Sequence, residues 1–167
     1  MRTFVALALC IVAACVSRPA AAQEAEVIAI GSPAPRVTVD DLDGKPVDLG
    51  RFLGKKPVLL EWWATWCEQC EALLPRLQAA HKEVGDVVQF IGVNVAVNQS
   101  PDRVRRYLRE QNPPFLALYD DQGTSTRAYR APSTSYVVIV DRTGKIAYTG
   151  VGGDQEFTEA LRRVATK

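Results

Sequence analysis

The sequence is poor in the residues that build metal sites. Its 167 residues contain one histidine and four cysteines. A structural zinc site takes four ligands, commonly from two Cys-x-x-Cys pairs or from added histidines. Cys10 and Cys15 lie among the first 22 residues, which have the pattern of an export signal, so the folded domain keeps only Cys67 and Cys70. We therefore expect no metal site, and we expect the lone His81 to be a solvated surface residue.

The sequence also lacks an excess of charge of either sign. Twenty basic and 19 acidic residues give a formal net charge of +1, so no nucleic-acid or polyanion partner is indicated. The apolar share of 47% is too high for a disordered chain. A compact fold of this length buries roughly two thirds of its unfolded surface and needs no disulfide to be stable. We expect one globular domain, with Cys67 and Cys70 serving something other than stability.

No apolar run is long enough to span a bilayer comfortably. The N-terminal run Phe4 to Val16 falls short of the roughly 20 residues that a transmembrane helix needs. Arg2 precedes it and small residues follow it, which predicts a signal peptide of residues 1–22, cleaved after Ala22. Two alternatives remain open. "VAAC", ending at Cys15, resembles the lipobox of bacterial lipoproteins, and an uncleaved segment would act as a membrane anchor. Each interpretation exports the protein, with the periplasm as the expected compartment.

The rest of the chain alternates between strand and helix patterns, which favours an α/β sandwich with a partly parallel sheet. A flexible lead-in at residues 23–34 is expected before the domain of residues 35–167, which opens with a hairpin turning at Asp43-Gly44. Ser100 is expected to cap one helix and Asp154 to cap the last. The expected strands are residues 56–64, 87–97, 115–120 and two within 135–150, and the expected helices are residues 67–84, 101–111, 124–129 and 154–167.

Cys67 and Cys70 lie where a buried strand pattern gives way to an amphipathic helix pattern. Unpaired backbone N–H groups and the positive end of the helix dipole meet at such a junction. They favour a thiolate, so the pKa of Cys67 should fall below the ordinary value of about 8.5. Cys70 follows almost one helical turn later on the same face. This spacing lets Cys67 attack a disulfide as the nucleophile and lets Cys70 resolve the mixed disulfide.

"EWWATWCEQC", followed by Pro75, resembles the active-site segment of thioredoxin-fold proteins. The pattern Gly-x-x-Ala-Pro…Asp-Gly-Lys-Pro…Leu that precedes it is similar to that of the exported, TlpA-like thiol–disulfide oxidoreductases related to the AhpC/TSA superfamily. The resemblance runs from about Ile30 to Ala165. It implies a thioredoxin-like fold, with a central mixed β-sheet flanked by helices, an N-terminal hairpin extension and a central insertion around residues 97–115.

The resemblance also implies roles for individual residues. Trp66 matches the aromatic residue that shields the disulfide, and Pro75 matches a helix proline that should bend the helix. Glu61, six residues before Cys67, falls where thioredoxin has a buried acid proposed to move protons for the resolving thiol. An inward-facing carboxyl there should have a raised pKa and could serve as general base for Cys70. The alternative is that Glu61 is a solvent-facing edge residue.

One loop departs from the family pattern. Thioredoxin folds place a cis-proline six residues before the aspartate of an Asp-x-x-Gly turn, and counting back from Asp141 gives Ser135, with Pro132 three residues earlier. A cis bond before serine would cost roughly 3–4 kcal/mol. Either Pro132 contributes from a longer loop, or Thr134 and Ser135 replace the motif in a trans conformation. We expect these three residues, with Trp66, to contact the substrate.

Glu68 and Gln69 stand between the cysteines where thioredoxin has Gly-Pro, and residues at these positions tune the redox potential. The sequence thus predicts an exported thiol–disulfide oxidoreductase that acts on protein thiols or disulfides through Cys67 and Cys70, without another cofactor. Reduction is the favoured direction, with a membrane or periplasmic protein as electron donor. Two other hypotheses are a thiol peroxidase of the AhpC/TSA superfamily and a redox-inactive or metal-delivering binding module.

Overall fold

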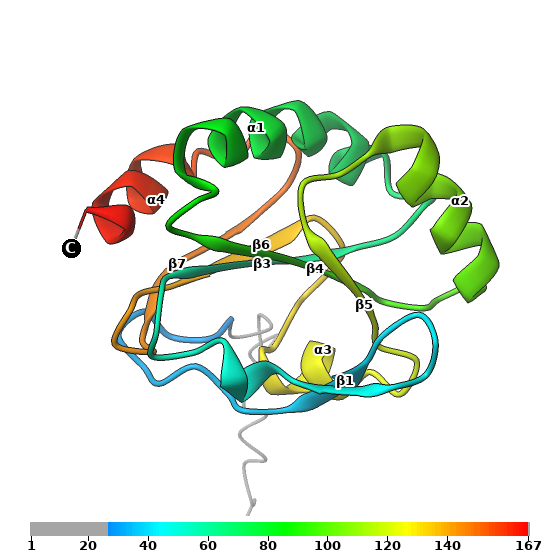
Figure 1. Cartoon of the computed structure of the whole chain (residues 1–167), viewed down its shortest axis with the longest axis horizontal. Coiled ribbons are helices and arrows are strands. Elements are labelled where there is room, and N and C mark those ends of the chain that lie inside the picture. Colours follow the sequence, from blue (N-terminus) through cyan, green and yellow to red (C-terminus); the bar gives the residue numbers. More distant parts are fainter. Residues whose placement is uncertain (1–26, 167) are drawn as a thin grey trace, which may run out of the picture.

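The computed structural model describes residues 27–166, so the predicted signal peptide, the lipobox alternative and residues 23–26 lie outside the described residues. One seven-stranded sheet forms the centre, with the strand order β2-β1-β5-β4-β3-β6-β7 (Figure 1). Its strands are β1 (Thr38–Asp40), β2 (Pro46–Asp48), β3 (Val58–Trp63), β4 (Gln89–Asn94), β5 (Leu116–Tyr119), β6 (Tyr136–Val140) and β7 (Ile146–Val151). The helices are the 3₁₀ turn η1 (Leu49–Arg51) and the α-helices α1 (Glu68–Val84), α2 (Pro101–Gln111), α3 (Thr124–Ala128) and α4 (Thr158–Ala165).

The sheet is mixed, as expected. β3, β4 and β5 run parallel, whereas β6 and β7 run antiparallel on one side and the β1–β2 hairpin pairs with β5 on the other. All six residues of the central strand β3 are buried, which explains its nearly continuous apolar sequence. No helix among residues 27–166 has the length and hydropathy needed to cross a membrane.

Alternate side chains of β3 pack into hydrophobic clusters on the two faces of the sheet, because successive side chains of a strand point to opposite faces. Leu60 and Trp62 belong to the cluster that also contains residues of the hairpin and Tyr129, next to α3. Leu59 packs with apolar residues of α1 and α4 on the other face. Trp63, on that same face, packs near both cysteines and Val104 of α2. Figure 1 shows α1, α2 and α4 on one side of the sheet and α3 with the hairpin on the other.

The predicted insertion is the crossover between the parallel strands β4 and β5, and its helix begins and ends as the sequence indicates. The Ser100 hydroxyl accepts a hydrogen bond from the Arg103 N–H, and Pro101 occupies the first turn. Asn112 ends α2 in the left-handed conformation, with a φ of 45°. Arg105 donates to the Leu42 carbonyl and to the Asp43 carboxylate, which attaches α2 to the hairpin.

Two expectations at the ends of the domain are wrong. The described part of the lead-in is packed: Ile28 and Ala34 are buried, the Gly31 N–H donates to the Ile146 carbonyl, and Pro33 bridges to Lys145. This segment lies along the β6–β7 hairpin and forms backbone hydrogen bonds with it. Its local sequence does not reveal this pairing, because the hairpin is more than 100 residues away along the chain.

The last helix begins at Thr158 rather than at Asp154, and it has no side-chain cap. Gly152 has a φ of 106°, so the chain leaves β7 through a conformation that other residues rarely adopt. Phe157, at the start of α4, is fully buried between the helix and the sheet. The loop of residues 152–157 therefore ends at Phe157, whose side chain packs in the hydrophobic core.

Phe115, next to β5, packs directly on Gly92 of β4, and a substitution at Gly92 tests this close packing. A Cβ there would lie only 2.4–2.7 Å from ring atoms of Phe115. We expect Gly92→Ala to lower the free energy of unfolding by about 1–3 kcal/mol through overpacking, measured by urea denaturation. Phe115→Leu should relieve part of this cost, so the double variant should be more stable than additivity predicts. Additive losses would contradict the contact.

Candidate active site

The two cysteines form a disulfide at the start of α1, with their Cα atoms 5.2 Å apart. Cys67 is the N-cap residue: its extended backbone precedes the helix, and its Sγ accepts the N–H of Cys70 at 3.0 Å. The Cys67 carbonyl also accepts the N–H of Glu71. The sulfur therefore occupies the place where a capping oxygen normally receives one of the unpaired N–H groups of a helix. This geometry favours negative charge on Cys67 once the disulfide is reduced.

The turn that carries Cys67 is braced by the loop after β4. Trp66 is 44% exposed, and its indole Nε1–H donates to the Val97 carbonyl at 2.8 Å. The Thr65 N–H donates to Gln99 Oε1 at 3.1 Å. Both cysteines are buried, Cys67 at 8% exposure and Cys70 at 4%, so Cys67 is the more exposed residue of the pair. Trp66 thus lies on the surface beside the disulfide, where the resemblance implied a shielding aromatic residue.

Glu61 is a buried carboxyl in the middle of β3. It is 2% exposed, and its Oε1 has no hydrogen-bond partner among the described residues. Burial raises the pKa of Glu61 to about 8, because the charged form is deprived of water. By strand alternation it shares a face with Trp63, which packs in the same cluster as the cysteines. The expectation of an inward-facing acid with a raised pKa is confirmed, and the solvent-facing alternative is wrong.

Tyr107 of α2 lies over this part of the sheet. Its ring centroid is 5.1 Å from that of Trp63. Burial raises the pKa of Tyr107, and the negative charges of Glu61 and Glu71 raise it further. Nothing in its local sequence sets Tyr107 apart, and sequence reasoning missed it.

The loop before β6 places Ser135, rather than Pro132, against the end of β3. Ser135 is buried with a φ of 59°, and its N–H donates to the Trp62 carbonyl at 2.8 Å. Pro132 is exposed and Thr134 is partly exposed. No cis peptide bond occurs among residues 27–166. Of the two arrangements expected for this loop, the geometry fits a trans loop in which Ser135 is bonded beside the active-site strand.

The two residues between the cysteines differ in their contacts. Glu68 is exposed in the first turn of α1. Gln69 reaches the loop after β7, where its Oε1 accepts the Gly153 N–H at 2.8 Å. Gln155 of the same loop bonds to the Ser135 carbonyl. Sequence reasoning missed Gly153 and Gln155; the Gly152-Gly153 pair after a strand marks a turn, but it does not reveal what the turn contacts.

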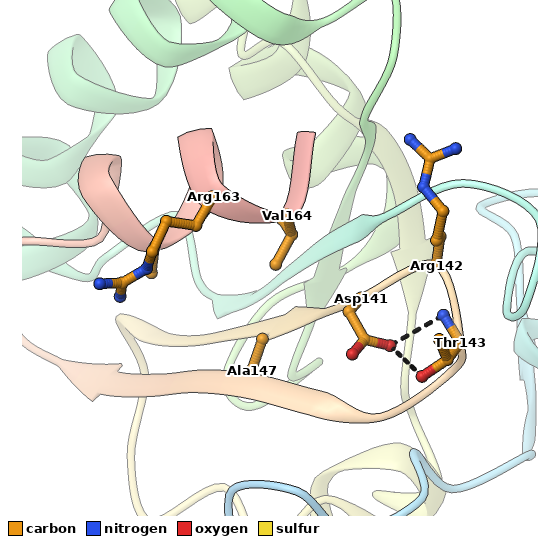
Figure 2. A pocket seen from close by; sticks show the side chains of 7 residues that line it. Asp141, Arg142, Thr143, Ala147, Arg163 and Val164 are labelled. Atoms are coloured by element: carbon orange, nitrogen blue, oxygen red, sulfur yellow. Dashed lines mark hydrogen bonds between the residues drawn. The ribbon is translucent and has the colours of Figure 1, made fainter. Parts of the chain in front are cut away.

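The remaining titratable residue singled out by the sequence lies apart from this site. His81 is exposed near the end of α1, as expected, and its ring packs edge-on against Phe90. A cavity of about 340 Å³ lies between α4 and the β6–β7 turn. Figure 2 shows Asp141 there, accepting hydrogen bonds from the backbone N–H and the hydroxyl of Thr143. Because Val140 pairs with Val58 at the start of β3, this cavity lies at the opposite end of the sheet from Cys67.

The sheet with its flanking helices, and a disulfide at the N-terminus of α1, define a thioredoxin-like fold with a redox-type cysteine pair. The Redoxin family model matches residues 29–163. Among curated proteins, thiol-disulfide oxidoreductase ResA of Bacillus cereus is 30% identical over 145 residues, covering 83% of this chain and 80% of ResA. Thiol:disulfide interchange protein DsbE of Yersinia pestis is 32% identical over 129 residues, covering 74% of this chain and 64% of DsbE.

Solved structures agree on the fold. The thioredoxin domain of a thiol-disulfide oxidoreductase from Bacteroides vulgatus superposes with a TM-score of 0.69 at 25% identity, covering 82% of this chain and 99% of that domain. A putative DsbE from Chlorobium tepidum gives a TM-score of 0.71 at 24% identity, covering 83% and 96% of the two chains. The chain belongs to the Redoxin family. Within it, the chain is a thiol–disulfide oxidoreductase of the ResA/DsbE type.

The buried Glu61 should make stability depend on pH. In the unfolded chain its pKa is about 4.5, whereas in the folded protein it is about 8. Between these values the unfolded chain releases the proton and the folded protein keeps it, so raising the pH from 4.5 to 8 favours unfolding. We expect the oxidised protein to lose stability relative to Glu61→Gln across this window, on the order of a few kcal/mol, in urea denaturation series. Parallel pH profiles for the two proteins would refute the assignment.

Proposed function

We propose that this protein is an exported disulfide reductase that exchanges electrons with partner proteins through Cys67 and Cys70. The observation that carries the proposal is the capping contact, in which Cys67 Sγ receives the Cys70 N–H at the start of α1. A thiolate at that position is the nucleophile that disulfide exchange requires. The cysteine pair is the redox group itself, so the reaction as proposed needs no further cofactor.

The cycle begins with the reduced protein. The Cys67 thiolate attacks one sulfur of a partner disulfide, forming a mixed disulfide and releasing the partner's other sulfur as a thiolate that takes up a proton. Cys70 then loses its proton and attacks the Cys67 sulfur, which closes the Cys67–Cys70 disulfide and releases the second partner sulfur as a thiolate that also takes up a proton. The partner gains two electrons and two protons, and the cysteine pair is oxidised.

Glu61 is the proposed general base for the second step. Its pKa of about 8 lies close to that of an ordinary thiol, so a proton passes between the two groups at little cost near neutral pH. At neutral pH most of the Glu61 carboxyl keeps its proton, and the ionised fraction is the form that accepts the proton of Cys70. Burial keeps bulk water from competing for the proton.

Charge near the cysteines supports the reductive direction. Glu68 and Glu71 both lie in the first turn of α1, where the helix terminus favours the thiolate. Their negative charges oppose the thiolate and thereby favour the disulfide form. A protein whose disulfide form is favoured gives up electrons more readily, in contrast to oxidants whose reduced form is stabilised. In an exported setting such a reductant needs electrons from a membrane or periplasmic donor.

The two cysteines should respond differently to replacement. We expect Cys67→Ser to abolish reduction of a protein disulfide, and Cys70→Ser to accumulate mixed disulfides, because attack by Cys67 then has no resolving step. Non-reducing gel electrophoresis and mass spectrometry with an oxidised model protein such as insulin measure the adducts. Equal loss of activity in both variants without trapped adducts would contradict the assigned roles.

The direction of transfer follows from the reduction potential. We expect the Cys67–Cys70 couple to lie below about −200 mV, nearer thioredoxin than the strong oxidant DsbA. Equilibration with a glutathione redox buffer measures it. Glu68→Gln should raise the potential, because it removes a negative charge that disfavours the thiolate. A value near −120 mV would reverse the direction and leave the exchange chemistry intact.

A further inference from the structure

The turn between the cysteines is joined to the loop after β7 by a side chain. Gln69 Oε1 accepts the Gly153 N–H at 2.8 Å. Because its partner is a donor, the amide must present its oxygen here. A Cβ on Gly153 would lie 2.7 Å from Ala72 Cβ and 2.9 Å from the Gln69 carbonyl oxygen. The loop therefore touches the first turn of α1 so closely that only glycine fits.

A second glutamine continues this connection to the Ser135 loop. Gln155 Nε2 donates to the Gly152 carbonyl at 2.8 Å and to the Ser135 carbonyl at 2.9 Å. The Gly152 N–H also donates to the Ser135 carbonyl, at 3.1 Å. Since both partners of its Nε2 are acceptors, Gln155 must present its nitrogen. The two glutamines thus use opposite ends of their amide groups, and with Gly152, Gly153 and Ser135 they form what we call the glutamine clamp.

The clamp includes a residue whose backbone conformation is rare for its type. Ser135 is fully buried with a φ of 59°, a region that residues other than glycine, asparagine and aspartate rarely occupy. Its N–H is fixed to the Trp62 carbonyl and its carbonyl oxygen accepts both clamp donors. Trp66, three residues before Gln69, and Val151, next to Gly152, are 44% and 45% exposed. Two residues that are neighbours of the clamp in sequence therefore present apolar side chains at the surface.

We propose that Gln69 and Gln155 are positioning residues that fix the Ser135 loop relative to the Cys67 sulfur, so that a partner protein chain is held beside the disulfide it exchanges. This inference rests on the proposed function and adds a determinant of substrate class. A small disulfide needs only access to the sulfur. A protein partner must contact the Cys67 sulfur and the Ser135 loop at the same time, so its rate of exchange depends on how these two are placed relative to each other.

The opposite use of the two amides gives a matched pair of substitutions. Gln69→Glu keeps an acceptor for the Gly153 N–H, whereas Gln69→Leu removes it. Gln155→Glu has nearly the same shape, but it replaces the donor to two carbonyls with an acceptor. Gln78, elsewhere on α1, offers control variants Gln78→Leu and Gln78→Glu.

The readout is kcat/KM for a protein disulfide, insulin, divided by kcat/KM for a small uncharged disulfide, 2,2′-dithiodipyridine. A change in thiolate reactivity alters both rates, so the ratio isolates partner placement. We expect Gln69→Leu and Gln155→Glu each to lower the ratio about tenfold, mainly through KM for insulin. Gln69→Glu should stay within about twofold of wild type, as should both Gln78 controls. In the Gln69→Leu/Gln155→Glu double variant, this ratio should fall at most about twofold below that of either single variant. Both substitutions disrupt the same clamp, so their effects should not multiply.

Equal loss toward both substrates, or losses that multiply in the double variant, would overturn the clamp. Hydrogen exchange at the Gly153 amide, followed by NMR in the oxidised protein, is independent of activity. Exchange should be faster in Gln69→Leu and unchanged in Gln69→Glu, and an unaltered rate in Gln69→Leu would also overturn it. If wild type reduces neither disulfide, the proposed function fails, and the Gly153 exchange rates alone decide whether the clamp exists.

Discussion

The hydrogen bond from the Cys70 N–H to Cys67 Sγ is the constraint on which the rest of the site depends. It requires an extended residue directly before a helix, and β3 supplies this by delivering the chain from the centre of the sheet to the start of α1. A serine or aspartate oxygen would cap the helix equally well. A sulfur in the same position gains the helix's unpaired N–H groups as partners for its negative charge, which converts a stabilising contact into a reactive one.

One acidic residue near the cysteines carries an energetic cost. Glu61 is buried and its Oε1 has no hydrogen-bond partner among the described residues, an arrangement that costs stability once the carboxyl ionises. A carboxyl kept for packing alone would be replaced by an apolar side chain at no such cost, because Leu59 and Trp63 on either side of it are buried. Its energetic cost is consistent with a role in proton transfer, where strained or desolvated groups tend to be found.

The sequence predicted the parts of the structure that depend on neighbours along the chain. The continuous apolar run of β3, the cysteine spacing and the Ser100–Pro101 start of α2 are local signals, and the structure bears them out. The packing of Ile28 and Ala34 along the β6–β7 hairpin and the late start of α4 could not be predicted, because each depends on a partner distant in sequence. Glu61 was identified because its spacing from Cys67 matched a family pattern, whereas Gln155 matched none.

The contrast between local signals and distant contacts also separates the residues of the redox chemistry from those that we propose to position a partner. The groups that we propose to set sulfur reactivity lie within ten residues of one another, from Glu61 to Glu71, on one strand and the helix that follows it. The groups of the clamp come from three segments, which meet only when β3, β6 and β7 are paired. In the scheme that we propose, a single substitution at Glu68 changes reactivity, whereas the placement of a partner depends on Gln69. Gln69 lies between the cysteines and also bonds to the loop after β7, so it connects the redox turn to the clamp.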